Sequence, residues 1–207
     1  MKIAVPELRI LFLRDYREGR LLTYKLGGRE KAGRGPIIVL IDNSSSMMGE
    51  KEIWSKAVAL GIFTIAYEER RDFIAIHFSS AHDPLIEIEI KPKGNNIPQK
   101  IYEFVTKFIG GGTDFEKPLS RAVDLMKNMP KADIIMISDG ICGVGEEWLK
   151  QFLENKKKMD FKVLSIIIGE PGASTDETLR KFSDKIYNPL DLEKEGDEVA
   201  VDVFGIL

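Results

Sequence analysis

The sequence has one cysteine, two histidines and no long uncharged apolar run. One cysteine cannot form an internal disulfide, which excludes a disulfide-stapled scaffold and fits a reducing compartment. A helix that spans a bilayer needs about 20 mostly apolar residues, and the chain has no such stretch. Residues 1–19 also lack the apolar core and cleavage site of a signal peptide. We therefore expect a cytoplasmic protein without membrane insertion.

An excess of basic residues is also missing. The chain has 30 Lys and Arg against 33 Asp and Glu, a net charge of −3 and a pI near 5.6. A nucleic-acid-binding surface usually shows as a strong basic excess, so we expect no nucleic-acid partner. The turn after the first predicted strand contains neither phosphate-binding glycine motif, and its first glycine is Gly49. This argues against nucleotide binding.

With 207 residues, of which 43% are apolar, the chain can bury the core of one large domain. Residues 1–35 read as an N-terminal leader. Its apolar pieces Leu8–Leu13 and Leu21–Tyr24 predict a hairpin or edge strand, and the glycine-rich stretch Gly27–Gly35 predicts a flexible connector. Residues 36–207 form the predicted main domain.

Short apolar runs alternate with amphipathic stretches from residue 36 onward. The apolar runs predict strands over Ile37–Ile41, Phe73–Phe78, Leu85–Ile90, Asp133–Ser138, Phe161–Ile168 and Lys185–Tyr187. The amphipathic stretches predict helices near Gly49–Arg70, Ile97–Phe108, Leu119–Met129, Glu146–Lys158, Thr175–Phe182 and Leu190–Val203. This alternation favours an α/β fold, a doubly wound and mostly parallel sheet flanked by helices, with one antiparallel edge strand.

Polar residues follow two of the predicted buried strands. Asp42, Ser44 and Ser46 follow the first strand, and Asp139 follows Asp133–Ser138. Thr113 lies in a glycine-rich loop between two predicted helices. Ligands of doubly wound sheets bind outside the carboxyl ends of the strands, so we expect these five residues to meet there.

These five residues offer two carboxylates and three hydroxyls, and hard divalent cations prefer such oxygen-only ligands. Mg²⁺ fits best, with Mn²⁺ or Ca²⁺ as alternatives. Two carboxylates leave the ion under-neutralised, and octahedral coordination leaves room for an outside oxygen. An acidic side chain of a protein partner would supply both oxygen and charge, so the pattern favours recognition over catalysis.

Each segment alone has a simpler explanation. Asp42 with its serines fits helix capping, as does the Gly-Thr-Asp stretch at Thr113 for a helix beginning near Phe115. Ser-Asp-Gly at Asp139 fits a plain turn. The presence of all three in chain order at strand ends favours the metal site.

The chain resembles a von Willebrand factor A (VWA) domain, whose metal-ion-dependent adhesion site (MIDAS) reads DxSxS, then Thr, then Asp. The matching residues are Asp42, Ser44, Ser46, Thr113 and Asp139. The resemblance implies a Rossmann-like fold in which the serines and threonine bind the ion directly and the aspartates bind it directly or through water.

Four stretches, GPIIVLIDNSSSM, HFSS, GGGTDF and ISDG, resemble the prokaryotic intracellular CoxE- or ViaA-like branch, whose members work beside MoxR-type AAA+ ATPases. The resemblance implies a non-enzymatic adaptor with such an ATPase as partner. Ser45 stands where the family usually has glycine. If that position required a positive φ, serine would add about 1 kcal/mol of strain.

A metal-dependent hydrolase or phosphatase with Asp42 as nucleophile is the alternative function. Such chemistry usually needs a second carboxylate two residues later as acid or base and a lysine to hold phosphate. Position 44 is serine, so the acid or base is missing.

Four further residues carry predictions. His77 is expected to be a hydrogen-bonded core residue, and Cys142 a small buried side chain or part of the site's rim. Asp114 is expected to orient Thr113 or cap a helix. Met47 and Met48 are expected to surround the ion as an adaptable contact surface.

Overall fold

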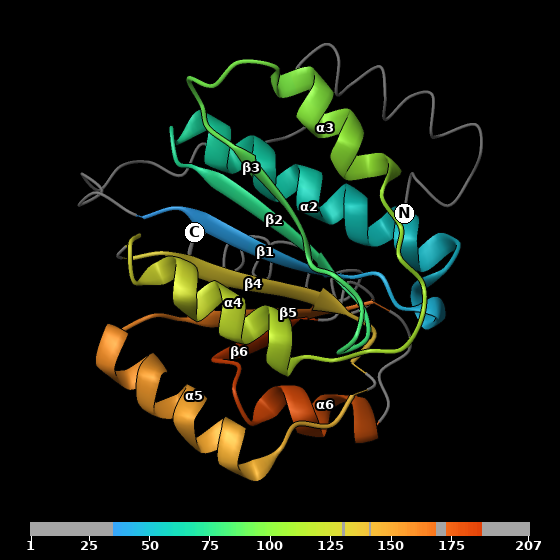
Figure 1. The fold of residues 1–207 in the computed structure, drawn as a ribbon, viewed down its shortest axis with the longest axis vertical. Helices are drawn as coiled ribbons and strands as arrows, with labels where there is room; N and C mark the ends of the chain where they lie inside the picture. Colours follow the sequence, from blue (N-terminus) through green and yellow to red (C-terminus); the bar gives the residue numbers. More distant parts are fainter. Residues whose placement is uncertain (1–34, 130, 141, 169–172, 188–207) are drawn as a thin grey trace. The chain divides into compact units, whose positions relative to one another are not determined.

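We analysed a computed structural model of the chain, which describes residues 35–129, 131–140, 142–168 and 173–187. The described residues form a six-stranded sheet flanked by helices (Figure 1). The strands are β1 (Ile37–Asp42), β2 (Phe73–Phe78), β3 (Ile86–Ile90), β4 (Asp133–Ser138), β5 (Val163–Ile167) and β6 (Lys185–Tyr187). Short β-branched runs account for them, because such side chains pack well on a pleated surface.

The strand order is β3-β2-β1-β4-β5-β6. All neighbouring strands pair in parallel except β3, which runs antiparallel to β2 at one edge. The alternating burial of Glu and Ile in β3 fits an edge strand with one solvated face. The predicted fold class, including the antiparallel edge strand, is confirmed.

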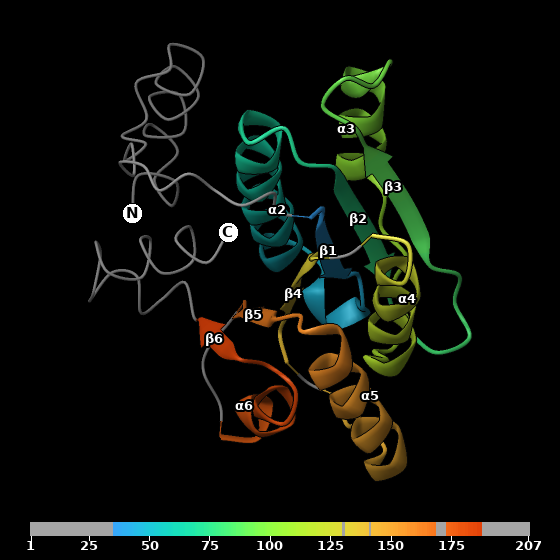
Figure 2. The ribbon, with the colours of Figure 1, turned by 90° about the vertical axis from the view of Figure 1, so that its left-hand side faces the viewer.

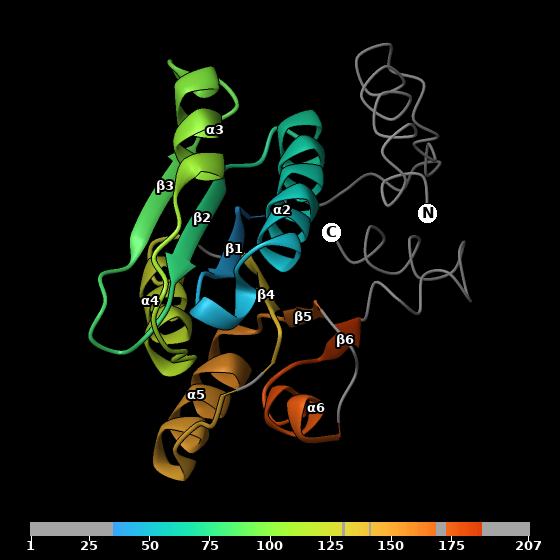
Figure 3. The same ribbon diagram turned by 90° about the vertical axis from the view of Figure 1, so that its right-hand side faces the viewer.

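The connecting helices are η1 (Ser45–Met47, a 3₁₀ turn), α2 (Glu50–Glu68), α3 (Ile97–Thr106), α4 (Glu116–Met126), α5 (Glu146–Met159) and α6 (Ala173–Arg180). Figures 2 and 3 show α2 on one side of the sheet and α4 and α5 on the other. This two-sided cover explains why β1, β2 and β5 are buried along their whole length.

Aromatic contacts identify the helices that share a face. Phe63 of α2 packs edge-on against Phe73 of β2, with ring centroids 5.4 Å apart, and Phe104 of α3 lies 6.5 Å from the same ring. On the opposite face, Phe152 of α5 and Leu179 of α6 belong to the main hydrophobic cluster together with side chains of α4.

The helix α4 begins at Glu116, one position after the expected start near Phe115. The backbone N–H of Lys117 donates to Asp114 Oδ2 at 3.1 Å, so Asp114 caps the helix, one of its two predicted roles. Pro118 fits in the first turn, where its missing N–H costs no intrahelical hydrogen bond.

The order of the sheet determines where a site can form. The chain passes from β1 to β2 on one side and later returns to β4 on the other side of β1. The loops that follow β1 and β4 therefore diverge at the carboxyl edge of the sheet, which is the usual binding position in doubly wound folds.

Some predictions lie outside the described residues. They are the hairpin or edge strand of the leader and the terminal helix at Leu190–Val203. No helix in the described ranges is long and apolar enough to cross a bilayer.

Candidate metal centre

Asp42 is the last residue of β1 and is fully buried. Both carboxylate oxygens accept hydrogen bonds. The backbone N–H of Ser44 donates to Oδ1 at 2.8 Å, and Ser138 Oγ donates to Oδ2 at 2.6 Å. Because Ser138 ends β4, this contact joins the carboxyl ends of the two central strands and fixes the orientation of the carboxylate.

The 3₁₀ turn after β1 brings two serine hydroxyls together. Ser44 is buried and Ser46 is exposed, and their Oγ atoms lie 3.1 Å apart. Met47, the last residue of the turn, is completely buried and anchors the loop in the core. The turn therefore holds both hydroxyls of the Asp-x-Ser-x-Ser motif at the same edge as Asp42.

The glycine-rich loop is bound to this turn by backbone hydrogen bonds. Gly110 N donates to Asn43 O, and Ser45 N donates to Gly111 O, each at 2.9 Å. Gly110 and Gly111 have φ of 78° and 92°, a region that side chains with a Cβ rarely adopt. The loop needs these glycines in order to reach the turn.

Thr113 follows this loop and is half-buried. Its carbonyl accepts a hydrogen bond from Cys142 Sγ at 3.3 Å, and Asp114 N donates to Ser79 O at the end of β2. Within the described ranges no hydrogen bond joins the Thr113 side chain to Asp42, Ser44, Ser46 or Asp139. The structure thus brings Thr113 to the expected edge without a direct hydrogen bond from its side chain to these residues.

Asp139, directly after β4, is only 4% exposed. Lys51 Nζ, in the first turn of α2, lies 3.0 Å from its Oδ2 atom. The other oxygen, Oδ1, is buried and has no hydrogen-bond partner among the described residues. Buried carboxylate oxygens are normally paired, so this one is available for a ligand.

The charge of Asp139 affects the ionisation of Asp42. Burial raises the pKa of Asp42 above its ordinary value of 3.8, and the negative charge of Asp139 raises it further. Hydrogen bonds from Ser138 and Ser44 act in the opposite direction. Two buried acids close enough to interact are a costly arrangement unless a cation neutralises them.

The residues present fit a hard divalent cation. The edge supplies the carboxylates of Asp42 and Asp139, the paired hydroxyls of Ser44 and Ser46, and one orphaned acid oxygen. No cluster of three or more His, Cys, Asp or Glu side chains forms a metal site within the described part of the chain. A site built from two carboxylates and several hydroxyls does not require such a cluster.

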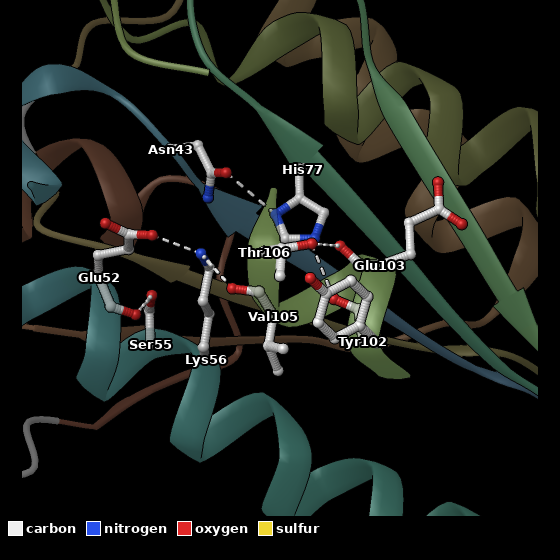
Figure 4. A network of polar contacts seen from close by, with 9 residues as sticks. All are labelled: Asn43, Glu52, Ser55, Lys56, His77, Tyr102, Glu103, Val105 and Thr106. Atoms are coloured by element: carbon white, nitrogen blue, oxygen red, sulfur yellow. Dashed lines mark hydrogen bonds and ion pairs between the residues drawn. The ribbon is translucent and has the colours of Figure 1, made fainter. Parts of the chain in front are cut away.

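Asn43 and His77 form a polar pair beside the same turn. His77 Nδ1 lies 3.1 Å from Asn43 Oδ1 (Figure 4). The imidazole ring packs against Phe104, with the ring centroids 5.1 Å apart. Burial, with the nearby charges of Lys56 and Lys107, lowers the pKa of His77 to about 3. The prediction that His77 is a hydrogen-bonded core residue is confirmed.

Three local predictions are now resolved. Ser45 does not have a positive φ, so its backbone is free of the strain that a serine would have there. Its Oγ atom accepts a hydrogen bond from Gly111 N at 2.9 Å. Met47 is buried in the core, whereas Met48 is 66% exposed, so only Met48 can contact a partner. Cys142 is half-buried and packs against the hydrophobic core, and its Sγ donates a hydrogen bond to the Thr113 carbonyl, so its side chain is less buried than expected and lies beside Thr113.

Sequence reasoning missed three residues at this edge. Ser138 was noted only as part of a turn, although a hydroxyl at the end of a strand beside Asp42 could have been recognised as a hydrogen-bond donor. Asn43 adjoins the motif and carried no predicted role. Lys51 gave no signal, because its contact with Asp139 joins residues 88 positions apart.

Comparison with known families agrees with this geometry. The sequence profile of the von Willebrand factor type A domain matches residues 37–141, from the start of β1 to the turn after Asp139. The chain belongs to this family. This VWA domain is 37% identical over 187 residues to an uncharacterised protein of Methanocaldococcus jannaschii. It is 28% identical over 176 residues to the regulatory protein ViaA of Edwardsiella ictaluri. The predicted family is confirmed, and ViaA fits the predicted branch.

These matches cover 89% and 76% of the VWA chain, but only 41% and 35% of the two relatives. Among solved structures, the pilus adhesin SpaC of Lactobacillus rhamnosus GG superimposes with a TM-score of 0.61 at 14% identity. That comparison covers 86% of this VWA domain and 31% of the adhesin chain. At this low identity the likeness concerns the fold alone.

Proposed function

We propose that this VWA domain is a non-enzymatic, Mg²⁺-dependent protein-interaction module. In this proposal Ser44, Ser46 and Thr113 hold the ion through their hydroxyls, and Asp42 and Asp139 hold it directly or through water. The observation that carries the proposal is the pair of buried, interacting carboxylates at one sheet edge, one of them with an unpaired oxygen.

The same observation supports an acidic partner. The ligand set contains two carboxylates and otherwise neutral hydroxyls, and Lys51 adds a positive charge at the same edge. The site with its metal is therefore under-neutralised and attracts a carboxylate from outside. Met48, 66% exposed beside the turn, offers an adaptable apolar contact next to that carboxylate.

Mg²⁺ is favoured because it binds a few carboxylates and keeps open positions for water or an outside oxygen. Mn²⁺ and Ca²⁺ accept similar oxygen ligands and remain alternatives. The choice among the three ions is part of the proposal.

The finer assignment is an adaptor that works with a MoxR-type AAA+ ATPase. Its support is similarity to the regulatory protein ViaA and the resemblance of the motifs to that branch. A cytoplasmic location belongs to the same proposal. The matched relatives are more than twice as long as the matched region. That this chain shares a partner with such longer proteins is therefore itself a proposal.

A metal-dependent hydrolase with Asp42 as nucleophile is the second candidate. Lys51 at the site favours it, because phosphate-ester chemistry uses a lysine to hold phosphate. Against it, Asp42 is fully buried and both its oxygens accept hydrogen bonds, so it has little freedom to attack a substrate. Turnover of a generic phosphate ester that Asp42→Asn abolishes would favour this candidate.

The interaction is tested by capture from a lysate of the source organism, with the purified chain as bait and mass spectrometry as readout. We expect wild-type chain in Mg²⁺ to retain a specific partner set that includes a MoxR-type ATPase. EDTA, Asp42→Ala and Ser46→Ala should abolish this retention, because each removes the ion or a ligand. Ser46 is exposed, so its variant should fold normally.

The matched control is Asp124→Ala. Asp124 is an exposed carboxylate near the end of α4, at the edge of the sheet opposite the site, so the variant should capture the same proteins as the wild type. Equal capture by Asp42→Ala and wild type in Mg²⁺ would contradict the proposal.

A further inference from the structure

Lys51 introduces a positive charge into the candidate metal centre. It lies in the first turn of α2, and its Nζ atom is 3.0 Å from Asp139 Oδ2. The two side chains differ in environment, since Lys51 is 37% exposed and Asp139 only 3%. The ammonium group thus comes from the solvent side and covers an otherwise buried acid.

This contact supplies the charge balance that the edge otherwise lacks. Asp42 and Asp139 are both buried and repel one another. The hydrogen bonds to Asp42 come from uncharged groups. Among the described residues, Lys51 forms an ion pair with one of these acids, and a paired ammonium lowers the cost of burying a carboxylate.

A divalent ion at this edge would compete with the Lys51 ammonium group for the negative charge of the Asp139 carboxylate. Asp139 Oδ2 is occupied by the ammonium, whereas Oδ1 has no partner. An ion bound by Asp139 would come within a few ångströms of Nζ, where two positive charges repel strongly outside bulk water. The long, partly exposed lysine side chain can turn into solvent.

We propose that Lys51 is an internal counter-ion that the metal displaces, and that its charge sets the affinity of the site. The inference rests on the proposed metal-binding function. Without metal, the ammonium keeps the carboxylates together. With metal, the ammonium leaves Asp139 and its repulsion weakens ion binding. The domain then loads at a higher metal concentration than its ligands alone would allow.

The test is titration of the purified chain with MgCl₂ in an isothermal calorimeter at fixed ionic strength. Lys51→Met removes the charge but keeps an unbranched apolar stem, and Lys51→Arg keeps the charge. Lys127→Met is the matched control, because Lys127 is a 65% exposed lysine at the end of α4 that pairs with Asp124. Thermal unfolding verifies that each variant is folded.

We expect Lys51→Met to bind Mg²⁺ about tenfold more tightly than wild type, and the other two variants to stay within about twofold. Reductive methylation of Lys51, followed by peptide mass spectrometry, should be faster in Mg²⁺ than in EDTA, because the displaced amine is free.

If the wild type binds Mg²⁺ and Lys51→Met binds it equally or more weakly, the inference is overturned. The proposed function stays intact in that case, because the wild type still binds the ion. Mg²⁺ binding by Lys51→Met but not by the wild type would support the inference, because the Lys51 ammonium would then exclude Mg²⁺ from the wild-type site. Binding by neither protein would overturn the proposed function and the inference with it.

Discussion

At the scale of single residues, the candidate site is built from acids held in an unfavourable environment. Burial raises the pKa of Asp42, and hydrogen bonds from Ser138 and Ser44 oppose this effect. Carboxylates with pKa values perturbed by burial and by a second charge gather at functional sites. The arrangement favours a binding role for the Asp-x-Ser-x-Ser motif over a role as a helix cap alone.

His77 plays a different part, since it remains neutral at physiological pH. Its pKa of about 3 results from burial and from the charges of Lys56 and Lys107. The ring contacts Asn43, whose carbonyl accepts a hydrogen bond from Gly110. His77 therefore helps to position the turn after β1 as a neutral side chain.

This position predicts a pH dependence of stability. The unfolded chain protonates His77 near pH 6.5, whereas the folded chain does so only near pH 3. Unfolding therefore takes up a proton between these values, and the free energy of unfolding falls as the pH is lowered. Between pH 7 and 5, we expect wild type to lose about 2 kcal/mol more than His77→Gln.

Denaturant unfolding in EDTA at the two pH values measures this difference. Exposed His82 provides the matched control, and His82→Gln should lose as much stability as wild type. The same loss in His77→Gln as in wild type would show that His77 is not the titrating group.

At the scale of elements, the contact between the turn after β1 and the glycine-rich loop assembles the site. Three hydrogen bonds join the two segments, between Gly110 and Asn43 and twice between Ser45 and Gly111. A substituted Cβ at Gly111 would lie 2.9 Å from Asp83 Oδ2. The loop thus combines a left-handed backbone with close packing.

We therefore expect Gly111→Ala to lower the free energy of unfolding by about 1–2 kcal/mol, because alanine is strained at a φ of 92°. The variant should also bind Mg²⁺ more weakly, since the displaced loop carries Thr113. Denaturant unfolding and calorimetric titration measure the two effects.

Gly112→Ala is the neighbouring control. Its added Cβ would meet Ser80 Cβ at 3.6 Å, an ordinary contact, and its φ is not positive. It should therefore change stability and binding little. Equal effects of the two substitutions would contradict the role assigned to Gly111.

The elements themselves were largely predictable from the sequence. The ranges of β2, β4 and β6 match the prediction at both ends, because short runs rich in apolar and aromatic residues indicate strands. The start of α4 at Glu116 lies one residue from the expected start near Phe115, which the capping pattern indicates although the apolar periodicity begins only at Leu119. Fold and family could thus be recognised from local patterns.

The candidate site was predictable only in part. The motif identified Asp42, Ser44 and Ser46, whose spacing along the chain sets their contact. The Lys51–Asp139 pair could not be foreseen, because it depends on where α2 starts relative to the turn after β4. The burial of Met47 also depended on the direction of the 3₁₀ turn.

At the scale of the whole molecule, the strand order explains why distant segments meet. Residues from positions 42, 113 and 139 lie at one edge because β1 sits between β2 and β4. The sequence as a whole has no basic excess, with a net charge of −3. Recognition through one charged centre is therefore consistent with the chemistry of the chain.

The most direct test of this account is a crystal structure of the chain grown with Mn²⁺, analysed by anomalous diffraction. The account predicts one strong anomalous peak within bonding distance of Ser44 and Ser46 Oγ, with Thr113, Asp42 and Asp139 around it and at least one vertex filled from solvent or a neighbouring carboxylate. A data set without a peak at this edge, or with a peak that these side chains do not touch, would contradict it.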